Sequence, residues 1–417
     1  MIARGFVEAV GGGIVYARLP AGRIGDGVRI GAGGAVINGT VCAAEGGRVS
    51  IAPHRAPNGI APGMPVCADP AALHLVLGSA LLGRAIDAAG AALDGAPVPT
   101  GKSVALATAA PDPRERRAID TPFWTGVRCI DGLLTIGRGA RVGIFGAPGT
   151  GKSTLLESIV AGCRADAVVV GLVGERGREA ERWLASVDAR TTLVVATSDR
   201  SAAERVRAAF VSAAQACALR RRGLSVVWVL DSLARTAQAL RELGIALGES
   251  TGRAGYPPSV FAEMARLTEV AGALRGAGSI TLVATVLDDG DDRDPVSDAA
   301  RSLLDGHLAL SPRVAASGRF PAIDVGASAS RTMPHVVDPE HAAAAAAVRG
   351  ALSLLEATAD ARALGIAPAE PAAVAAIAAL PGLEAFLRQD ARPAGRDETL
   401  ASLYRLADTL RESDGYY

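Results

Sequence analysis

The residues whose spacing most clearly indicates chemistry form one short loop that reads Gly-Ala-Pro-Gly-Thr-Gly-Lys-Ser-Thr. The pattern Gly-x-x-x-x-Gly-Lys-Ser is typical of a loop whose backbone N–H groups bind the phosphates of a nucleoside triphosphate. Lys152 is one of only two lysines in the chain, and its compact ammonium group fits a narrow phosphate loop better than the planar guanidinium of arginine. We predict that the whole loop contacts nucleotide: Gly146, Ala147, Pro148, Gly149, Thr150, Gly151, Lys152, Ser153 and Thr154.

Two acidic residues follow apolar runs and indicate the rest of a nucleotide site. Asp231 directly follows the apolar run 226–230. A carboxylate at the end of such a strand typically holds Mg²⁺ through its water shell, and we expect the Ser153 hydroxyl to bind the same ion. Glu175 follows the run 167–173 and is placed to polarise a water for attack on the γ-phosphate, with Arg176 beside it to orient the carboxylate. The plainer interpretations are an aspartate that caps a helix and a salt-bridged surface loop.

Arg331, after Ser330, is a further candidate. A lone arginine near a sheet edge is usually a surface residue. It acquires a catalytic role only where it reaches the nucleotide of a neighbouring subunit, as an arginine finger that stabilises charge in trans.

The elements that must position these residues divide the chain into three parts. Residues 1–92 contain short strands separated by glycines, which predicts a small closed β-barrel. Residues 93–337 begin with a Pro/Gly-rich linker and continue with Val/Ile/Leu runs that alternate with helical segments. This pattern predicts an α/β fold, a parallel sheet wrapped by helices. Residues 338–417 are rich in Ala and Leu and predict a helical domain. The predicted strands of the sheet are 142–146, 167–173, 192–196, 225–230 and 279–286.

Composition excludes some functions. Lys plus Arg equals Asp plus Glu at 43 each, so the net charge is zero, which argues against a protein that coats nucleic acid. The five cysteines are scattered without a C-x-x-C spacing, as expected of small buried residues in a reducing compartment. There is no signal-peptide pattern and no apolar run of about 18 residues, and we therefore expect a cytoplasmic protein.

Several segments together resemble one family, the export ATPase of type III secretion systems, including the flagellar branch. This family is itself similar to the catalytic subunit of rotary F- and V-type ATPases. The resemblance extends over roughly residues 5–340. It is carried by the stretches 125–145, 230–242, 255–262, 302–311 and 320–325 around the phosphate loop.

The resemblance implies a homohexameric ring that binds ATP and Mg²⁺ at each subunit interface. It implies that Glu175 is the catalytic glutamate, that Arg176, Asp231 and Arg235 support it, and that Arg331 is the finger. Phe320 stands where the family usually has a tyrosine beside the adenine, and it keeps a stacking face. The implied partners are central stalk and stator proteins, an export gate and chaperone–substrate complexes. The implied place is the cytoplasmic face of the inner membrane, with only peripheral membrane contact and no nucleic acid.

The sequence departs from the family pattern in places. The loop 287–295, which faces the ring centre in the family, is one residue short and lacks a glutamate. Residues 264–272 lack the usual Leu-Pro and Glu-Arg, and a motif expected near 363–367 is not recognisable, although 386–389 fits.

Three alternative functions remain open: a subunit of a rotary proton-coupled ATPase, an RNA-translocating ring and a non-catalytic ring. The second requires stacking aromatic residues near the amino terminus, where residues 1–90 offer only Phe6 and Tyr16. Glu175 argues against the third.

Overall fold

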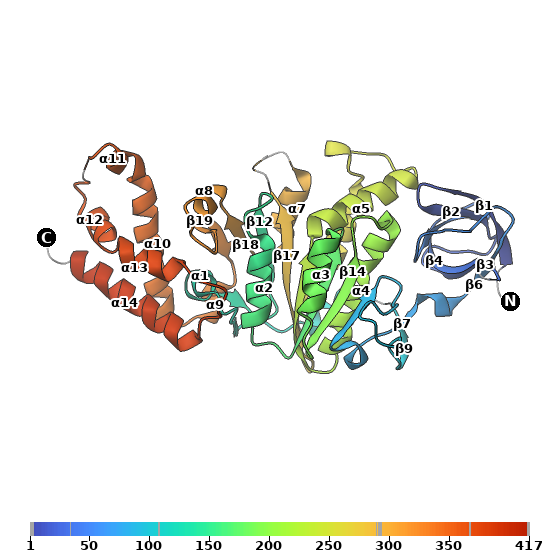
Figure 1. The fold of residues 1–417 in the computed structure, drawn as a ribbon, viewed down its shortest axis with the longest axis horizontal. Helices are drawn as coiled ribbons and strands as arrows, with labels where there is room; N and C mark the ends of the chain where they lie inside the picture. Colours follow the sequence, from blue (N-terminus) through green and yellow to red (C-terminus); the bar gives the residue numbers. More distant parts are fainter. Residues whose placement is uncertain are drawn as a thin grey trace.

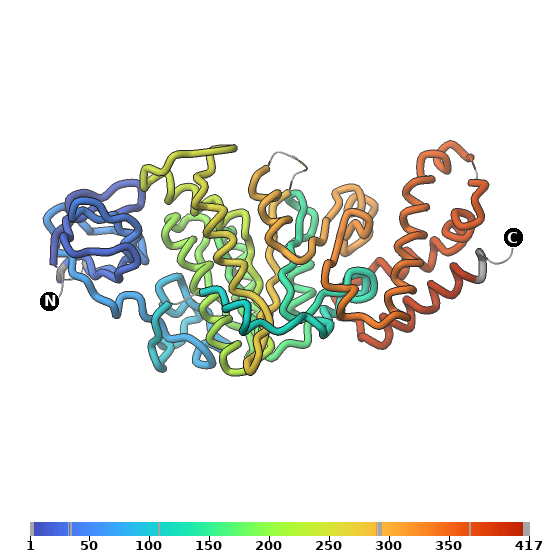
Figure 2. Tube along the Cα trace, turned by 180° about the vertical axis from the view of Figure 1, so that it is seen from behind, coloured from blue at the N-terminus to red at the C-terminus, as the bar shows by residue number. Residues whose placement is uncertain are grey.

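The computed structural model describes residues 4–33, 35–106, 109–288, 290, 294–366 and 368–414. The molecule is elongated, with a β-barrel at one end, a sheet covered by helices in the middle and a helical domain at the other end (Figure 1). The amino and carboxyl ends lie at opposite tips, as the view from behind also shows (Figure 2). The three predicted kinds of structure are therefore confirmed.

The amino-terminal barrel is closed by six antiparallel strands in the order β1-β2-β5-β4-β3-β6. Alternate side chains point inward and form its core, among them Val7, Val15, Val28, Ile51 and Val66. Its strands are β1 (Arg4–Gly11), β2 (Ile14–Arg18), β3 (Gly27–Ala32), β4 (Ala35–Glu45), β5 (Arg48–Pro53) and β6 (Pro65–Ala68).

The last strand of the closed barrel ends at Ala68, well before the boundary predicted at residue 92. The strand β8 (Arg84–Asp87) leaves the barrel region and pairs in parallel with β14 (Thr191–Ala196) at the edge of the central sheet. Nearby, β7 (His74–Val76) pairs with β9 (Ser103–Ala105) from the predicted linker. A strand of four residues carries no local mark of its partner, since the pairing with β14 spans about a hundred residues.

The central sheet has the strand order β19-β18-β12-β17-β15-β13-β14-β8, and every pair on this path is parallel except β18 with β19. The five predicted strands are all present, as β12 (Arg141–Gly146), β13 (Ala167–Val173), β14, β15 (Ser225–Asp231) and β17 (Ser279–Leu287). The strands β18 (Gly306–Leu310) and β19 (Ile323–Ser330) extend the sheet on the β12 side. Buried side chains on both faces explain the near-continuous apolar runs.

Helices cover both faces of the sheet, and each face has its own core. Leu155, Leu156 and Trp183 belong to the core on the α2 and α3 side, and Phe210, Leu233 and Met264 belong to the other. The helices of this domain are α1 (Arg128–Leu133), α2 (Lys152–Gly162), α3 (Gly177–Ala185), α4 (Ala202–Arg220), α5 (Leu233–Ala246), α6 (Pro258–Thr268), α7 (Pro295–Leu303), α8 (Pro312–Ala316) and α9 (Met333–Val336).

The carboxy-terminal domain is helical, and α10, α12 and α14 pack against one another. Its helices are α10 (Pro339–Ala357), α11 (Ala359–Ala363), α12 (Pro371–Ala378), α13 (Leu380–Leu387) and α14 (Arg396–Asp414). Pro381, which interrupts the Ala-rich pattern, lies in the first turn of α13, where its missing N–H costs nothing. Among the described residues, no helix is long and apolar enough to cross a membrane.

Candidate active site

The parallel sheet brings the predicted site residues to one edge, because the carboxyl ends of neighbouring parallel strands coincide. The phosphate loop follows β12, Glu175 follows β13, and Asp231 is the last residue of β15. Together they line a pocket of about 470 Å³ with Lys152, Ser153 and Arg235. A site predicted from separate stretches of sequence is therefore one place in the fold.

The phosphate loop connects β12 to α2. Gly149 and Gly151 have positive φ angles of 81° and 94°, which glycine adopts without strain. Lys152 Nζ donates hydrogen bonds to the carbonyl oxygens of Gly146 at 2.7 Å and Ala147 at 2.8 Å. No side chain caps the amino terminus of α2, so its first N–H groups can bind an anion. Burial lowers the pKa of Lys152, as expected of an ammonium group whose charge a bound phosphate would offset.

Glu175, in the loop between β13 and α3, is hydrogen-bonded by an arginine of α5. Arg235 Nε, on α5, donates a hydrogen bond to Glu175 Oε1 at 2.9 Å. Arg176, the residue expected to orient this carboxylate, is exposed before α3, and its backbone N–H donates to Glu179 Oε2 at 3.3 Å. Its role stays a prediction. Burial, a hydrogen bond to Glu179 and the charge of Asp231 together raise the pKa of Glu175 to about 8. Such a carboxyl titrates near neutral pH, as a general base should.

Asp231 is buried beneath the loop, and it accepts a hydrogen bond at its Oδ1 from the Thr285 hydroxyl at 2.6 Å. Burial raises its pKa. Its carboxylate and the Ser153 hydroxyl line the same pocket, and this set of oxygen donors suits Mg²⁺, which keeps most of its water ligands. Among the described residues, no group of three or more His, Cys, Asp or Glu side chains is arranged to hold a metal ion by itself. The residues thus fit an ion held mainly by water and phosphate oxygens.

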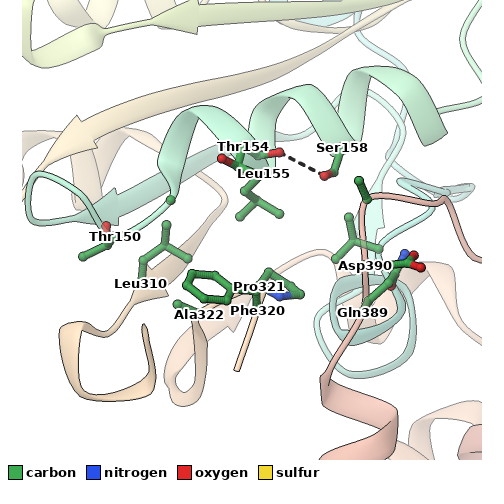
Figure 3. Close-up of a pocket in the computed structure, with 13 residues that line it drawn as sticks. Thr150, Thr154, Leu155, Ser158, Leu310, Phe320, Pro321, Ala322, Gln389 and Asp390 are labelled. Carbon is green, nitrogen blue, oxygen red and sulfur yellow. Dashed lines mark hydrogen bonds between the residues drawn. The ribbon is translucent and has the colours of Figure 1, made fainter. Parts of the chain in front are cut away.

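A second pocket, of about 270 Å³, lies on the other side of the phosphate loop and shares Gly151 and Thr154 with the first (Figure 3). Figure 3 shows Phe320 and Pro321 opposite Leu155 of α2, with Gln389 and Asp390 closing one end. Phe320 is 47% exposed and presents a ring to this space. This apolar slot beside the phosphate loop, the base pocket, is suited to a nucleobase.

The nucleotide-binding domain matches a known family over residues 126–330: the ATP synthase alpha/beta family, nucleotide-binding domain. The flagellum-specific ATP synthase of Pseudomonas aeruginosa is 42% identical over 88% of this chain and 83% of its own length. The type 3 secretion system ATPase of Pseudomonas syringae pv. tomato is 39% identical over 98% of this chain and 94% of its own length. The chain belongs to the family of type III secretion and flagellar export ATPases.

Solved structures of this export ATPase family have the same fold. The assembled ATPase EscN from the enteropathogenic E. coli type III secretion system superposes with a TM-score of 0.90 at 38% identity. The superposition covers 97% of this chain and all of that chain. EscN in complex with its central stalk EscO gives a TM-score of 0.87 at 37% identity. The chain is accordingly an ATPase with a barrel, a nucleotide-binding domain and a helical domain.

Three residues of the export ATPase site were not predicted. Thr285, Glu179 and Gln389 contact Asp231, Glu175 and the base pocket respectively. Thr285 lies near the carboxyl end of the predicted strand 279–286, and this position could have indicated that its side chain lies near the site. Gln389 belongs to the matching stretch 386–389, but its position beside this pocket depends on a contact across the fold. Its backbone N–H donates to the Phe320 carbonyl at 2.8 Å.

Arg331 lies at the amino ends of the parallel strands, whereas the phosphate loop of its own chain lies at their carboxyl ends. It follows β19, whose last residue, Ser330, pairs with Gly306 at the start of β18. Its guanidinium donates to the carbonyl oxygens of Leu304 at 3.2 Å and Arg301 at 3.4 Å. Within one chain the structure therefore does not bring Arg331 to Lys152. Residues 289 and 291–293 of the shortened loop 287–295 lie outside the described residues.

Proposed function

We propose that this chain hydrolyses Mg·ATP as a homohexameric ring and thereby energises type III protein export. The observation that carries the proposal is the convergence of Lys152, Glu175 and Asp231 in one pocket at the carboxyl edge of a parallel sheet. The proposed work is release of secreted proteins from chaperones, unfolding, and delivery to an export gate at the cytoplasmic face of the inner membrane. Stator proteins are further proposed partners.

Each residue has a distinct part in hydrolysis. Backbone N–H groups at the start of α2 bind the β- and γ-phosphates, and Lys152 leaves the Gly146 and Ala147 carbonyls to neutralise them. Ionised Glu175, oriented by Arg235, accepts a proton from the attacking water. Ser153 and Asp231 would hold Mg²⁺, which would supply charge stabilisation to the transferring phosphoryl group. Phe320 stacks on the adenine.

Two observations support a ring. The related EscN was solved as an assembly and with a central stalk, EscO. Arg331 lies at the opposite ends of the strands from the phosphate loop of its own chain, so it does not reach its own nucleotide. It would reach the nucleotide of a neighbouring subunit that packs against this side of the sheet. Each proposed active site is therefore composite, with the phosphate loop from one chain and the finger from the next.

The decisive test is phosphate release by purified wild-type and variant protein. Lys152→Ala and Glu175→Gln should each lower kcat by roughly 10³-fold or more, because each removes transition-state stabilisation or the base. Lys102→Ala, at the only other lysine, and Glu181→Gln, at an exposed glutamate of α3, are matched controls that should retain activity. Hydrolysis that survives in either active-site variant would refute the assignment.

The export role has its own test. Wild-type protein with ATP should release a secreted protein from its purified chaperone, and Glu175→Gln should not. A chain that forms active hexamers by itself also counts against the alternative of a rotary ATPase subunit, which works with a non-identical partner. ATPase activity without any effect on chaperone complexes would confine the proposal to hydrolysis.

A further inference from the structure

A cluster of charged residues lies at the sheet edge that carries Arg331, far from the phosphate loop. Arg141, the first residue of β12, is its centre. Its Nη1 contacts Glu269 Oε1, and its Nε and Nη2 donate to the Asp305 carboxylate at 3.1 Å and 3.0 Å. Arg116, from the segment before α1, completes the cluster through Glu269 Oε2 at 2.9 Å.

Backbone bonds reinforce the contact between Arg141 and Asp305. The Arg141 N–H donates to Asp305 Oδ2 at 2.9 Å, and the Asp305 N–H donates to the Arg141 carbonyl at 2.7 Å. Both side chains are largely withdrawn from water, with exposed fractions of 20% and 24%. A bidentate pair of this kind is directional, so it fixes the position of the Asp305 backbone relative to β12.

Arg331 is attached to the segment that this pair fixes. Its backbone N–H donates to the Asp305 carbonyl at 2.9 Å, and its Nη1 donates to the neighbouring Leu304 carbonyl at 3.2 Å. The Arg301 carbonyl lies in the last turn of α7 and the Leu304 carbonyl directly follows the helix, where the helix dipole favours a cation. The long side-chain bonds and the exposure of Arg331 leave its guanidinium able to leave α7 for a neighbouring phosphate, while its backbone stays anchored.

We propose that Arg141 and Asp305 are positioning residues for the arginine finger, acting on the active site of the next subunit rather than on their own. This inference rests on the proposed composite site. Loss of the pair should displace Arg331 without changing the phosphate loop of the same chain. A displacement of about 1 Å at a catalytic group can lower the rate by about 10²-fold.

The first test uses Asp305→Asn, which keeps the shape of the side chain and removes its charge. The ring should form, KM for ATP should stay near the wild-type value, and kcat should fall about 10- to 100-fold. Arg141→Lys should act in the same direction, since it keeps the charge and loses the bidentate geometry. Glu269→Gln removes the other partner of Arg141 and leaves the link from Asp305 to Arg331, so its kcat should stay near wild type. A loss of nucleotide affinity or of thermal stability that accounts for the lost rate would overturn the inference.

The second test uses mixed rings in single turnover, with ATP below the concentration of sites. Asp305→Asn subunits have an intact phosphate loop, and Lys152→Ala subunits have an intact finger. A mixture therefore contains sites that combine both intact parts, and its rate should exceed the sum of the separate rates several-fold. Arg331→Ala mixed with Lys152→Ala is the reference. Recovery for the reference alone would overturn the positioning role of Asp305, and no recovery for either mixture would contradict the composite site itself.

Discussion

Arg235 Nε donates a hydrogen bond to Oε1 of Glu175 across 2.9 Å, although the two residues lie 60 positions apart in the chain. The contact joins the ends of two adjacent strands, because Arg235 follows β15 and Glu175 follows β13. It holds the proposed base in one orientation and opposes the other influences on its charge, since burial and Asp231 both disfavour ionisation.

Replacing Arg235 with Gln should therefore impair catalysis through Glu175. The carboxyl would lose a nearby positive charge, its pKa would rise further, and kcat near neutral pH should fall about 10- to 100-fold. Arg235→Lys, which keeps the charge, should lie between this variant and wild type. The measurement is kcat against pH, and an Arg235→Gln profile that matches wild type in both height and midpoint would contradict the role.

The pH dependence of the wild-type rate should report Glu175. The folded-state pKa of this carboxyl is about 8, so it is protonated and unable to accept a proton from water at lower pH. We expect kcat/KM to rise as pH increases toward about 8 and to level off above it. In Glu175→Gln the residual rate should lose this rise. The profile is measured with buffers of constant ionic strength.

The same shift has a consequence for stability. Because the folded pKa of Glu175 lies above the ordinary glutamate value of about 4.5, ionisation opposes folding, and its effect on stability becomes less favourable as pH rises from about 4.5 through 8. Without nucleotide, the thermal midpoint of wild type should thus decrease over this range more than that of Glu175→Gln. Parallel curves for the two proteins would show that Glu175 titrates at its ordinary value.

Phe320 should govern nucleotide affinity rather than turnover. Phe320→Ala removes the stacking face of the base pocket, worth about 0.5–1.5 kcal/mol, and should raise KM for ATP about 3- to 10-fold with little change in kcat. Phe320→Tyr keeps a stacking ring and should bind ATP about as well as wild type. Equal KM values for all three proteins would place the base elsewhere.

Asp131 should be important for stability. Its buried carboxylate accepts bonds from the Thr125 N–H at 2.8 Å, the Thr125 hydroxyl at 2.7 Å and the Gly126 N–H at 2.9 Å. Asp131→Ala would leave these donors without a partner and should cost about 3 kcal/mol or more. Asp131→Asn, which retains one carbonyl oxygen, should cost less. Thermal unfolding of the three proteins compares them, and equal losses would show that cavity formation dominates.

The strands and the phosphate loop were predictable because their signals are local. A strand buried on both faces needs an unbroken apolar run, and a phosphate loop needs its glycines and Lys152 at fixed spacing. The positions of Glu175 and Asp231 followed, since parallel strands end at a common edge.

The remaining features depend on contacts that no local pattern contains. The backbone N–H of Arg128 donates to Gln389 Oε1 at 2.8 Å across 261 residues, and this bond helps to place the helical domain beside the base pocket. The strand β8 similarly found its partner, β14, far along the chain. The sequence predicted Arg176 as the partner of Glu175 because the two are adjacent. In the fold, Arg235 donates a hydrogen bond to Glu175 from α5, the helix that follows the neighbouring strand β15.

Gln389 lines the base pocket and also belongs to the segment that connects α13 to α14 in the helical domain. Gln389 Nε2 donates to the Gly126 carbonyl at 2.8 Å, and its backbone N–H donates to Phe320, so the start of the segment after α13 is bonded to both sides of the slot. Any load that displaces the helical domain must also change the width of that slot. In the proposed function, where the helical domain contacts export substrates and the slot binds adenine, these bonds link the two contacts, so a load on the first should change nucleotide affinity at the second.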